Sequence, residues 1–280
     1  MPAPEPVVVT VFADGPGGGN PAPVVLDARG WSDTDMQRVA RETGHESAFV
    51  VDAEGTGCDV ALRFWVPRHE MSMCGHATLG AVWLLHQRGL LPGSRELRVH
   101  TASGVVRARV ADDGAVTISQ PLGTVEAVAD DAEVLAALGV RRADVAGPVR
   151  NATTSRTKTL VELADPERLD TLAPAPDEVE RACSTVDSTG LYPHARTGAR
   201  RFDARQFPRA SGYPEDPATG IAAAALVSGL VDAGTVDPTA GPVVVRQGRA
   251  MGRPSRITVT VDRDDPAGPV LWLGGPVQLG

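Results

Sequence analysis

Two segments of this chain are too apolar to lie on the surface of a folded protein. The first, residues 79–85, follows the turn CGHAT, and the second, residues 221–231, follows the turn EDPATG. A helix that is hydrophobic on all sides must be enclosed by protein or membrane, and neither segment reaches the roughly 18 apolar residues of a membrane span. The sequence therefore predicts two buried helices, over residues 76–88 and 219–233, each beginning at a polar turn that contains glycine.

Strand-like segments precede and follow each of these helices, so the order strands, helix, strands occurs twice. Such an order differs from the regular β-α-β alternation of a parallel α/β sheet. We therefore expect an α+β fold made of two mostly antiparallel sheets, each curled around one helix. A boundary is expected near Gln120-Pro121.

Composition excludes several classes of function. The net charge of −8 argues against nucleic-acid partners, which require clustered cations. Three cysteines without a CxxC spacing argue against a disulfide framework or a structural zinc site. Lys158 is the single lysine, which sets aside pyridoxal-phosphate and Schiff-base chemistry. The first residues lack a basic region followed by a long apolar run, so we expect a cytoplasmic protein without a signal peptide or membrane segment.

The two polar turns carry groups that can bind anions and exchange protons. A helix N-terminus has unpaired N–H groups and about half a positive charge, so it can bind a carboxylate or stabilise an enolate-like anion. His76 and Asp216 lie at these turns and can exchange protons. Taken alone, His76 is more typical of a satisfied polar residue at a turn, and Asp216 is as typical of a helix cap as of a catalytic group.

Two further residues could carry proton chemistry. Glu46 precedes the apolar strand SAFVV, where burial would raise the pKa of its carboxyl group; by itself it fits an ordinary loop glutamate better. Cys74 could act in a two-thiol racemase, but the second turn offers Asp216 in place of a partner thiol. We therefore interpret Cys74 as a packing residue, and a metal site formed by Cys74, His76 and His45 as poorly supported.

An ordered series of motifs is similar to one known family. The chain resembles the PhzF (phenazine biosynthesis-like) family, which shares the diaminopimelate epimerase fold. The resemblance covers nearly the whole chain and rests on the segments VFADGPGGGNPAPVV, RETGHESAFV, RFWVPRHEMSMCGHATLGA, TASG, RQFPRASGYPEDPATG and QGRAMGRPSRI.

The resemblance implies two pseudo-symmetric lobes with the active site between them. The first lobe would comprise residues 1–118 and about 268–280, with its central helix at 76–88. The second would comprise residues 119–267, with its central helix at 219–233. It also implies homodimers and acid–base chemistry without cofactor or metal, on a small carboxylated substrate.

Residue roles follow from the same resemblance. The catalytic set maps to Glu46, His76 and Asp216. The substrate-binding set maps to Asn20, Gly75, Ser103, Gly220 and Ile221. In the phenazine-type pattern a serine of the active site follows EDPATG, whereas this chain has Ile221. Loss of a hydroxyl partner can discriminate strongly between substrates, so we expect a substrate that is more apolar, or differently substituted, than the standard phenazine precursor.

These observations favour an isomerase that shifts a proton and a double bond in a small carboxylated, amino-acid-like or cyclic metabolite, as in secondary-metabolite or antibiotic biosynthesis. A first alternative is an amino-acid epimerase or racemase on the same scaffold, which would return the proton to the same carbon. A second alternative is a non-catalytic small-molecule-binding protein. Retention of three titratable groups argues against the second alternative, because binding alone does not require them.

Overall fold

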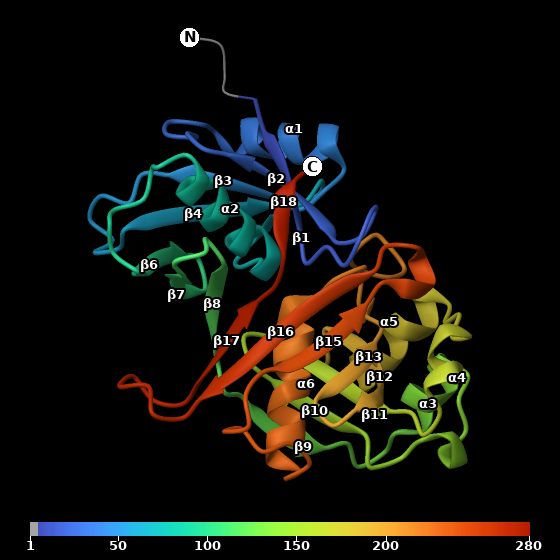
Figure 1. Cartoon of the computed structure of the whole chain (residues 1–280). Coiled ribbons are helices and arrows are strands. Elements are labelled where there is room, and N and C mark those ends of the chain that lie inside the picture. Colours follow the sequence, from blue (N-terminus) through green and yellow to red (C-terminus); the bar gives the residue numbers. More distant parts are fainter. Residues whose placement is uncertain (1–4) are drawn as a thin grey trace. The chain divides into compact units, whose positions relative to one another are not determined.

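The computed structural model describes residues 5–280, and residues 1–4 of the predicted N-terminal lobe lie outside the described part. The chain folds into two compact units (Figure 1). Unit 1 comprises residues 1–119 and 274–280, and unit 2 comprises residues 120–273. The lobe limits expected from the sequence, 118 and about 268, remain a prediction. No helix among the described residues is both long enough and apolar enough to cross a membrane.

Unit 1 is a curled sheet with one helix against each of its faces. Its strands are β1 Val7–Val11, β2 Asn20–Val25, β3 Ser47–Val51, β4 Val60–Trp65, β5 Glu70–Met71, β6 Glu96–Thr101, β7 Gly104–Val110 and β18 Val277–Leu279, and β8 Val116–Pro121 leads into unit 2. Helix α1 (Asp33–Thr43) contacts β3 and β4, and helix α2 (Gly75–Gln87) contacts β1, β2, β3 and β7. Figure 1 shows α2 among the strands of this unit.

Unit 2 repeats this plan with more helices. Its strands are β9 Thr124–Ala127, β10 Arg150–Thr153, β11 Thr157–Glu162, β12 Gly190–Gly198, β13 Arg201–Ala204, β14 Phe207–Pro208, β15 Val243–Gln247 and β16 Ser255–Asp262, and β17 Val270–Gly274 leads back to unit 1. Its helices are α3 Ala132–Leu138, α4 Pro166–Asp170, α5 Pro176–Thr185 and α6 Gly220–Asp232, with short 3-10 turns at Arg142–Asp144 and Arg249–Met251.

Strand pairing shows that the two sheets are copies of one pattern. In unit 1, β1–β2 is antiparallel, β2–β3 parallel, β3–β4 antiparallel, β4–β6 parallel and β6–β7 antiparallel. In unit 2, the pairs β10–β11, β11–β12, β12–β13, β13–β15 and β15–β16 follow the same alternation. The central helix occupies the same place in each pattern, since α2 lies between β4 and β6 and α6 lies between β13 and β15. The fold is thus α+β with two pseudo-symmetric halves, as expected, although two pairings in each half are parallel.

The central helices are enclosed because almost every side of them is apolar. Ten residues of α2 and eleven of α6 are buried. Both helices have 13 residues, and each begins one residue away from its predicted start, because Cys74 and Thr219 are the N-cap residues.

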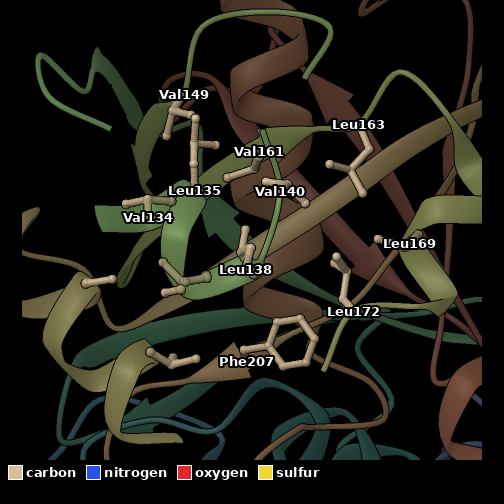
Figure 2. Close-up of a cluster of buried hydrophobic side chains, with 14 of the residues drawn as sticks. Val134, Leu135, Leu138, Val140, Val149, Val161, Leu163, Leu169, Leu172 and Phe207 are labelled. Atoms are coloured by element: carbon tan, nitrogen blue, oxygen red, sulfur yellow. The ribbon is translucent and has the colours of Figure 1, made fainter. Parts of the chain in front are cut away.

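The outer helices cover separate apolar clusters. In unit 1, Met36 and Val39 of α1 pack on Phe49. In unit 2, a larger cluster joins α3 and α5 to the sheet, and Figure 2 shows Leu138 and Phe207 within it. Each sheet therefore packs against its central helix and also against outer helices, which are α1 in unit 1 and α3, α4 and α5 in unit 2.

Candidate active site

Glu46 is placed by the sharp end of α1. Gly44 ends this helix in the left-handed conformation (φ 69°), which glycine adopts without steric cost. The chain then reverses into β3, which begins at Ser47 and runs parallel to β2. Glu46 lies just before this strand, and only 17% of its side chain is exposed. The carboxylate of Glu46 is therefore largely buried beside the apolar strand β3, as its position in the sequence predicted.

Cys74 and His76 are placed by the first turn of α2. Cys74 is the N-cap residue, and its side chain makes no capping hydrogen bond. Its thiol is therefore available to other partners, while its carbonyl oxygen accepts hydrogen bonds from the backbone N–H and the hydroxyl group of Thr78. Both side chains are nearly enclosed, with 3% of Cys74 and 5% of His76 exposed.

These three side chains form one compact cluster. The Cys74 thiol donates to Oε2 of Glu46 at 3.2 Å, and Sγ lies 3.4 Å from Nδ1 of His76. Nδ1 of His76 also lies 3.4 Å from Oε2 of Glu46. Cys74 is buried, as its interpretation as a packing residue predicts, and its sulfur also contacts both predicted proton-transfer groups. The sequence could not show this, because Glu46 and Cys74 are brought together only by the packing of β3 beside α2.

The other ring nitrogen of His76 points elsewhere. Nε2 is buried and has no hydrogen-bond partner among residues 5–280. A buried polar atom without a partner costs about 1–3 kcal/mol, so its position calls for a functional explanation. The Glu46, Cys74 and His76 cluster is also the one group of three potential metal-ligating side chains found in the described part of the chain, with its ligand atoms within 4.8 Å of one another.

In unit 2, Asp216 lies at the approach to α6. The N-cap residue of α6 is Thr219 rather than Asp216, so Asp216 does not occupy the ordinary capping position. The hydroxyl group of Thr219 donates a short hydrogen bond to Oδ2 of Asp216, and the backbone N–H of Asp216 donates to the carbonyl oxygen of Gln206 at 3.1 Å. Asp216 is buried, with 9% exposed.

Gln247 was missed by the sequence reasoning, although its motif was noted. Its amide nitrogen donates to the carbonyl oxygen of Asp216 at 2.6 Å and to the hydroxyl group of Thr219 at 3.2 Å. Its amide oxygen accepts from the hydroxyl group of Tyr192 at 3.0 Å. Complete burial raises the pKa of Tyr192 far above its usual value, so the phenol keeps the proton that it donates. Gln247 therefore fixes the segment that presents Asp216.

An ion pair holds the other side of the same segment. Arg205 and Glu215 form two parallel hydrogen bonds of 2.9 and 2.6 Å, and their side chains are 9% and 10% exposed. The third guanidinium nitrogen of Arg205, Nη1, donates to the carbonyl oxygens of Leu169 and Leu172. Bidentate pairs of this kind fix geometry as well as charge. Glu215, the residue before Asp216, is thus fixed in position, which restricts the conformations open to Asp216.

The start of α6 carries a hydrocarbon side chain at the position where the start of α2 carries an imidazole. Gly75 and Gly220 are the first residues of two helices of equal length, so His76 and Ile221 occupy the same helical position. Ile221 is buried with 7% exposed. The first backbone N–H groups of both helices have no partner within the helix and lie at its positive end. Both starts can therefore bind an anion, but one carries imidazole and the other a hydrocarbon side chain.

The remaining predicted substrate-binding residues lie in turns of unit 1. Asn20 is buried at the start of β2, opposite Val11 of β1. Gly19 before it has φ 86°, and a Cβ there would lie 2.8 Å from the carbonyl oxygen of Val11, so the turn requires glycine. Ser103 lies in the exposed turn between β6 and β7, and its N–H donates to the carbonyl oxygen of Ser72 at 3.1 Å, two residues before Cys74.

Comparison with known proteins gives consistent matches. The family model described as phenazine biosynthesis-like protein, PhzC-PhzF, matches residues 9–275. An uncharacterized isomerase, YddE, of Escherichia coli is 30% identical over 97% of this chain and 95% of its own length. A trans-2,3-dihydro-3-hydroxyanthranilate isomerase of Pseudomonas fluorescens is 32% identical over 89% of this chain and 87% of its own length.

Solved structures agree in fold. A PhzF-family protein of Bacillus anthracis has a TM-score of 0.85 at 24% identity and covers 100% of this chain and 97% of its own. A predicted epimerase of Pseudomonas aeruginosa has a TM-score of 0.80 at 28% identity, with 99% and 97% covered. The chain therefore belongs to the PhzC-PhzF family of phenazine biosynthesis-like proteins and is an isomerase of that family.

Proposed function

We propose that this isomerase moves a proton, and with it a carbon–carbon double bond, within a small carboxylated metabolite that is cyclic or amino-acid-like. The observation that carries the proposal is the buried cluster of Glu46, Cys74 and His76 at the start of α2. A carboxylate held in a nearly enclosed place beside an imidazole is suited to removing a proton from carbon.

Glu46 is proposed to begin the reaction by accepting a carbon-bound proton. The electron pair of the broken C–H bond then spreads into the conjugated system of the substrate, and a proton is delivered to another carbon. The positive end of α2 stabilises the anion that forms. Nε2 of His76, which has no partner among the described residues, offers a hydrogen bond to a substrate oxygen.

Asp216 is proposed as the second acid–base group of the same reaction, as the family pattern implies. Support comes from the way in which it is held, between the Thr219 hydroxyl group and the Gln247 amide. Fixed orientation is what a group needs if it is to deliver a proton to one chosen carbon. We propose that the substrate carboxylate and the atoms next to it are bound by the backbone N–H groups of Gly75 and Gly220 together with Asn20 and Ser103.

A second candidate function is epimerisation, in which the proton returns to the carbon that lost it. The similarity to the predicted epimerase of Pseudomonas aeruginosa favours it. The same residues would serve, so the two reactions differ in where the proton arrives. A role in secondary-metabolite or antibiotic biosynthesis, and a homodimeric state, are proposals that rest on the family resemblance.

The test is proton exchange in D2O, followed by NMR. The compounds are trans-2,3-dihydro-3-hydroxyanthranilate, after the Pseudomonas relative, and a panel of L-amino acids. Deuterium at a new carbon with a shifted double bond supports the isomerase, and deuterium at the α-carbon with loss of optical purity supports the epimerase.

The matched variant is Glu46→Gln, which keeps the shape of the side chain and removes its basicity. We expect turnover and deuterium incorporation to fall by about 10²- to 10⁴-fold, the range contributed by one general acid–base group. The control is Glu42→Gln, in the exposed last turn of α1, which should leave both rates unchanged. Wild-type turnover by Glu46→Gln contradicts the assignment of Glu46.

A further inference from the structure

The cluster at the start of α2 contains three kinds of metal ligand. It offers a carboxylate oxygen from Glu46, a thiol sulfur from Cys74 and an imidazole nitrogen from His76. All three are ligands that zinc accepts in proteins. Their polar atoms already converge, at 3.2 Å for sulfur and oxygen, 3.4 Å for sulfur and nitrogen, and 3.4 Å for nitrogen and oxygen.

These separations match those between the ligands of one tetrahedral zinc ion. Zinc binds sulfur at about 2.3 Å and nitrogen or oxygen at about 2.0–2.1 Å, so tetrahedral angles place neighbouring ligand atoms about 3.3–3.6 Å apart. The two distances of 3.4 Å lie within that range, and the sulfur–oxygen distance of 3.2 Å lies just below it. An ion could therefore be bound on one side of the triangle with little movement of the side chains.

The surroundings indicate a reversible site rather than a structural one. A ligating histidine usually donates its other N–H to an acceptor, and loss of such a partner lowers metal affinity by about 10- to 100-fold. Nε2 of His76 has no such partner among residues 5–280. Three ligands are found for this position among the described residues, so the fourth would be left to water or substrate, as in catalytic zinc sites.

We propose that Glu46, Cys74 and His76 bind one zinc ion reversibly and that the bound ion switches off the isomerase. Binding replaces the thiol proton of Cys74, which is released to solvent as the zinc–sulfur bond forms. The ion also occupies the carboxylate oxygen of Glu46. Inhibition therefore rests on the proposed role of Glu46 in proton transfer, whereas binding does not.

Cobalt(II), a coloured substitute for zinc, gives a direct test of binding on chelator-treated, tag-free protein. The wild-type protein should bind one equivalent and develop a thiolate-to-cobalt charge-transfer band together with tetrahedral d–d bands, and zinc should displace both. Cys74→Ala should abolish the charge-transfer band. Glu46→Gln and His76→Ala should each weaken binding by at least about tenfold, since even the loss of an outer partner of a ligand costs that much.

Cys58→Ser is the matched control, because Cys58 is another free thiol of unit 1 that lies outside the cluster; its titration should match that of the wild type. Circular dichroism establishes that each variant is folded. If Cys74→Ala does not fold, the nearly isosteric Glu46→Gln still tests the site. Absence of the bands in the wild type, or their persistence at full strength in the Glu46 and Cys74 variants, overturns the site.

Activity forms a separate arm. Micromolar zinc should inhibit D2O exchange by the wild type, and a chelator should restore the rate. Cobalt bands without inhibition would leave the binding site intact and overturn only the switch. Loss of turnover by Glu46→Gln with no metal binding by the wild type would support the proposed function and overturn the metal site.

Discussion

Ile221 holds the place in α6 that His76 holds in α2, the second residue of a 13-residue helix. The surrounding polar groups of unit 2 are arranged to hold Asp216, through Thr219 and Gln247. The buried side chain of Ile221 contributes apolar surface but cannot form a hydrogen bond. We therefore propose that Ile221 influences which substrate is accepted.

Restoring the serine of the phenazine-type pattern tests this assignment. Ile221→Ser should raise kcat/KM for trans-2,3-dihydro-3-hydroxyanthranilate by about tenfold, because a net hydrogen bond contributes about 1–1.5 kcal/mol. Steady-state kinetics measures the change. Ile221→Ala is the control, since it removes the same bulk without adding a hydroxyl group. An equal gain in both variants would assign the effect to space, and no gain in Ile221→Ser would contradict the assignment.

Gly80 shows why α2 can lie so close to its sheet. A Cβ at this position would lie 2.7 Å from Cγ2 of Val9 and 3.1 Å from Cγ2 of Val11, and both valines are fully buried. Gly229 has the corresponding relation to Leu160 in unit 2, at 2.5 Å. Each central helix thus has a glycine at a position where a Cβ would clash with a side chain of its own sheet.

Gly80→Ala should therefore destabilise the protein, although alanine is the better helix former by up to about 1 kcal/mol. Overpacking a tight core costs about 1–3 kcal/mol, so we expect a net decrease in Tm of a few degrees, measured by thermal unfolding. Gly93→Ala is the control, because apart from its chain neighbours no atom of residues 5–280 lies within 4 Å of a Cβ there. The penalty should shrink in a Val9→Ala background, since the two positions are in contact. A higher Tm for Gly80→Ala would contradict this account.

The central helices could be predicted from sequence because their apolar character is local. Residues 76–88 and 219–233 were expected, and the helices lie within one residue of these limits. The parallel pairings could not be predicted, because register depends on which strand lies beside which. The contact between Cys74 and Glu46 and the support of Asp216 by Gln247 join residues 28 and 31 positions apart, and no local pattern reports such contacts.

At the scale of the whole molecule, stability should fall in mild acid because of one buried imidazole. Burial lowers the pKa of His194 from 6.5 to about 4. Between these two values the unfolded chain binds a proton that the folded protein does not, so stability rises with pH across this window and is lost as pH falls through it. The loss is on the order of 3 kcal/mol.

Chemical unfolding between pH 7 and pH 4 measures this loss. His194→Asn can keep the hydrogen-bonding contact with the carbonyl oxygen of Tyr192 and removes the titration, so its stability should depend less on pH by the same amount. The difference in pH dependence between the wild type and the variant gives the contribution of His194, because the carboxylates are the same in both proteins. Parallel pH profiles would contradict the assignment.

Strand β18 joins the start of the described chain to its end. It pairs antiparallel with β1, with Val9 opposite Leu279 and Val11 opposite Val277, while all of unit 2 lies between them in sequence. Because a chain is synthesised from its N-terminus, β1 is made before unit 2 and its partner β18 is made after unit 2. Unit 2 can therefore complete its sheet while one edge of β1 is still open, and open strand edges are sites of misassociation. In the cell, the sheet of unit 1 is begun before unit 2 is made but can be completed only after it.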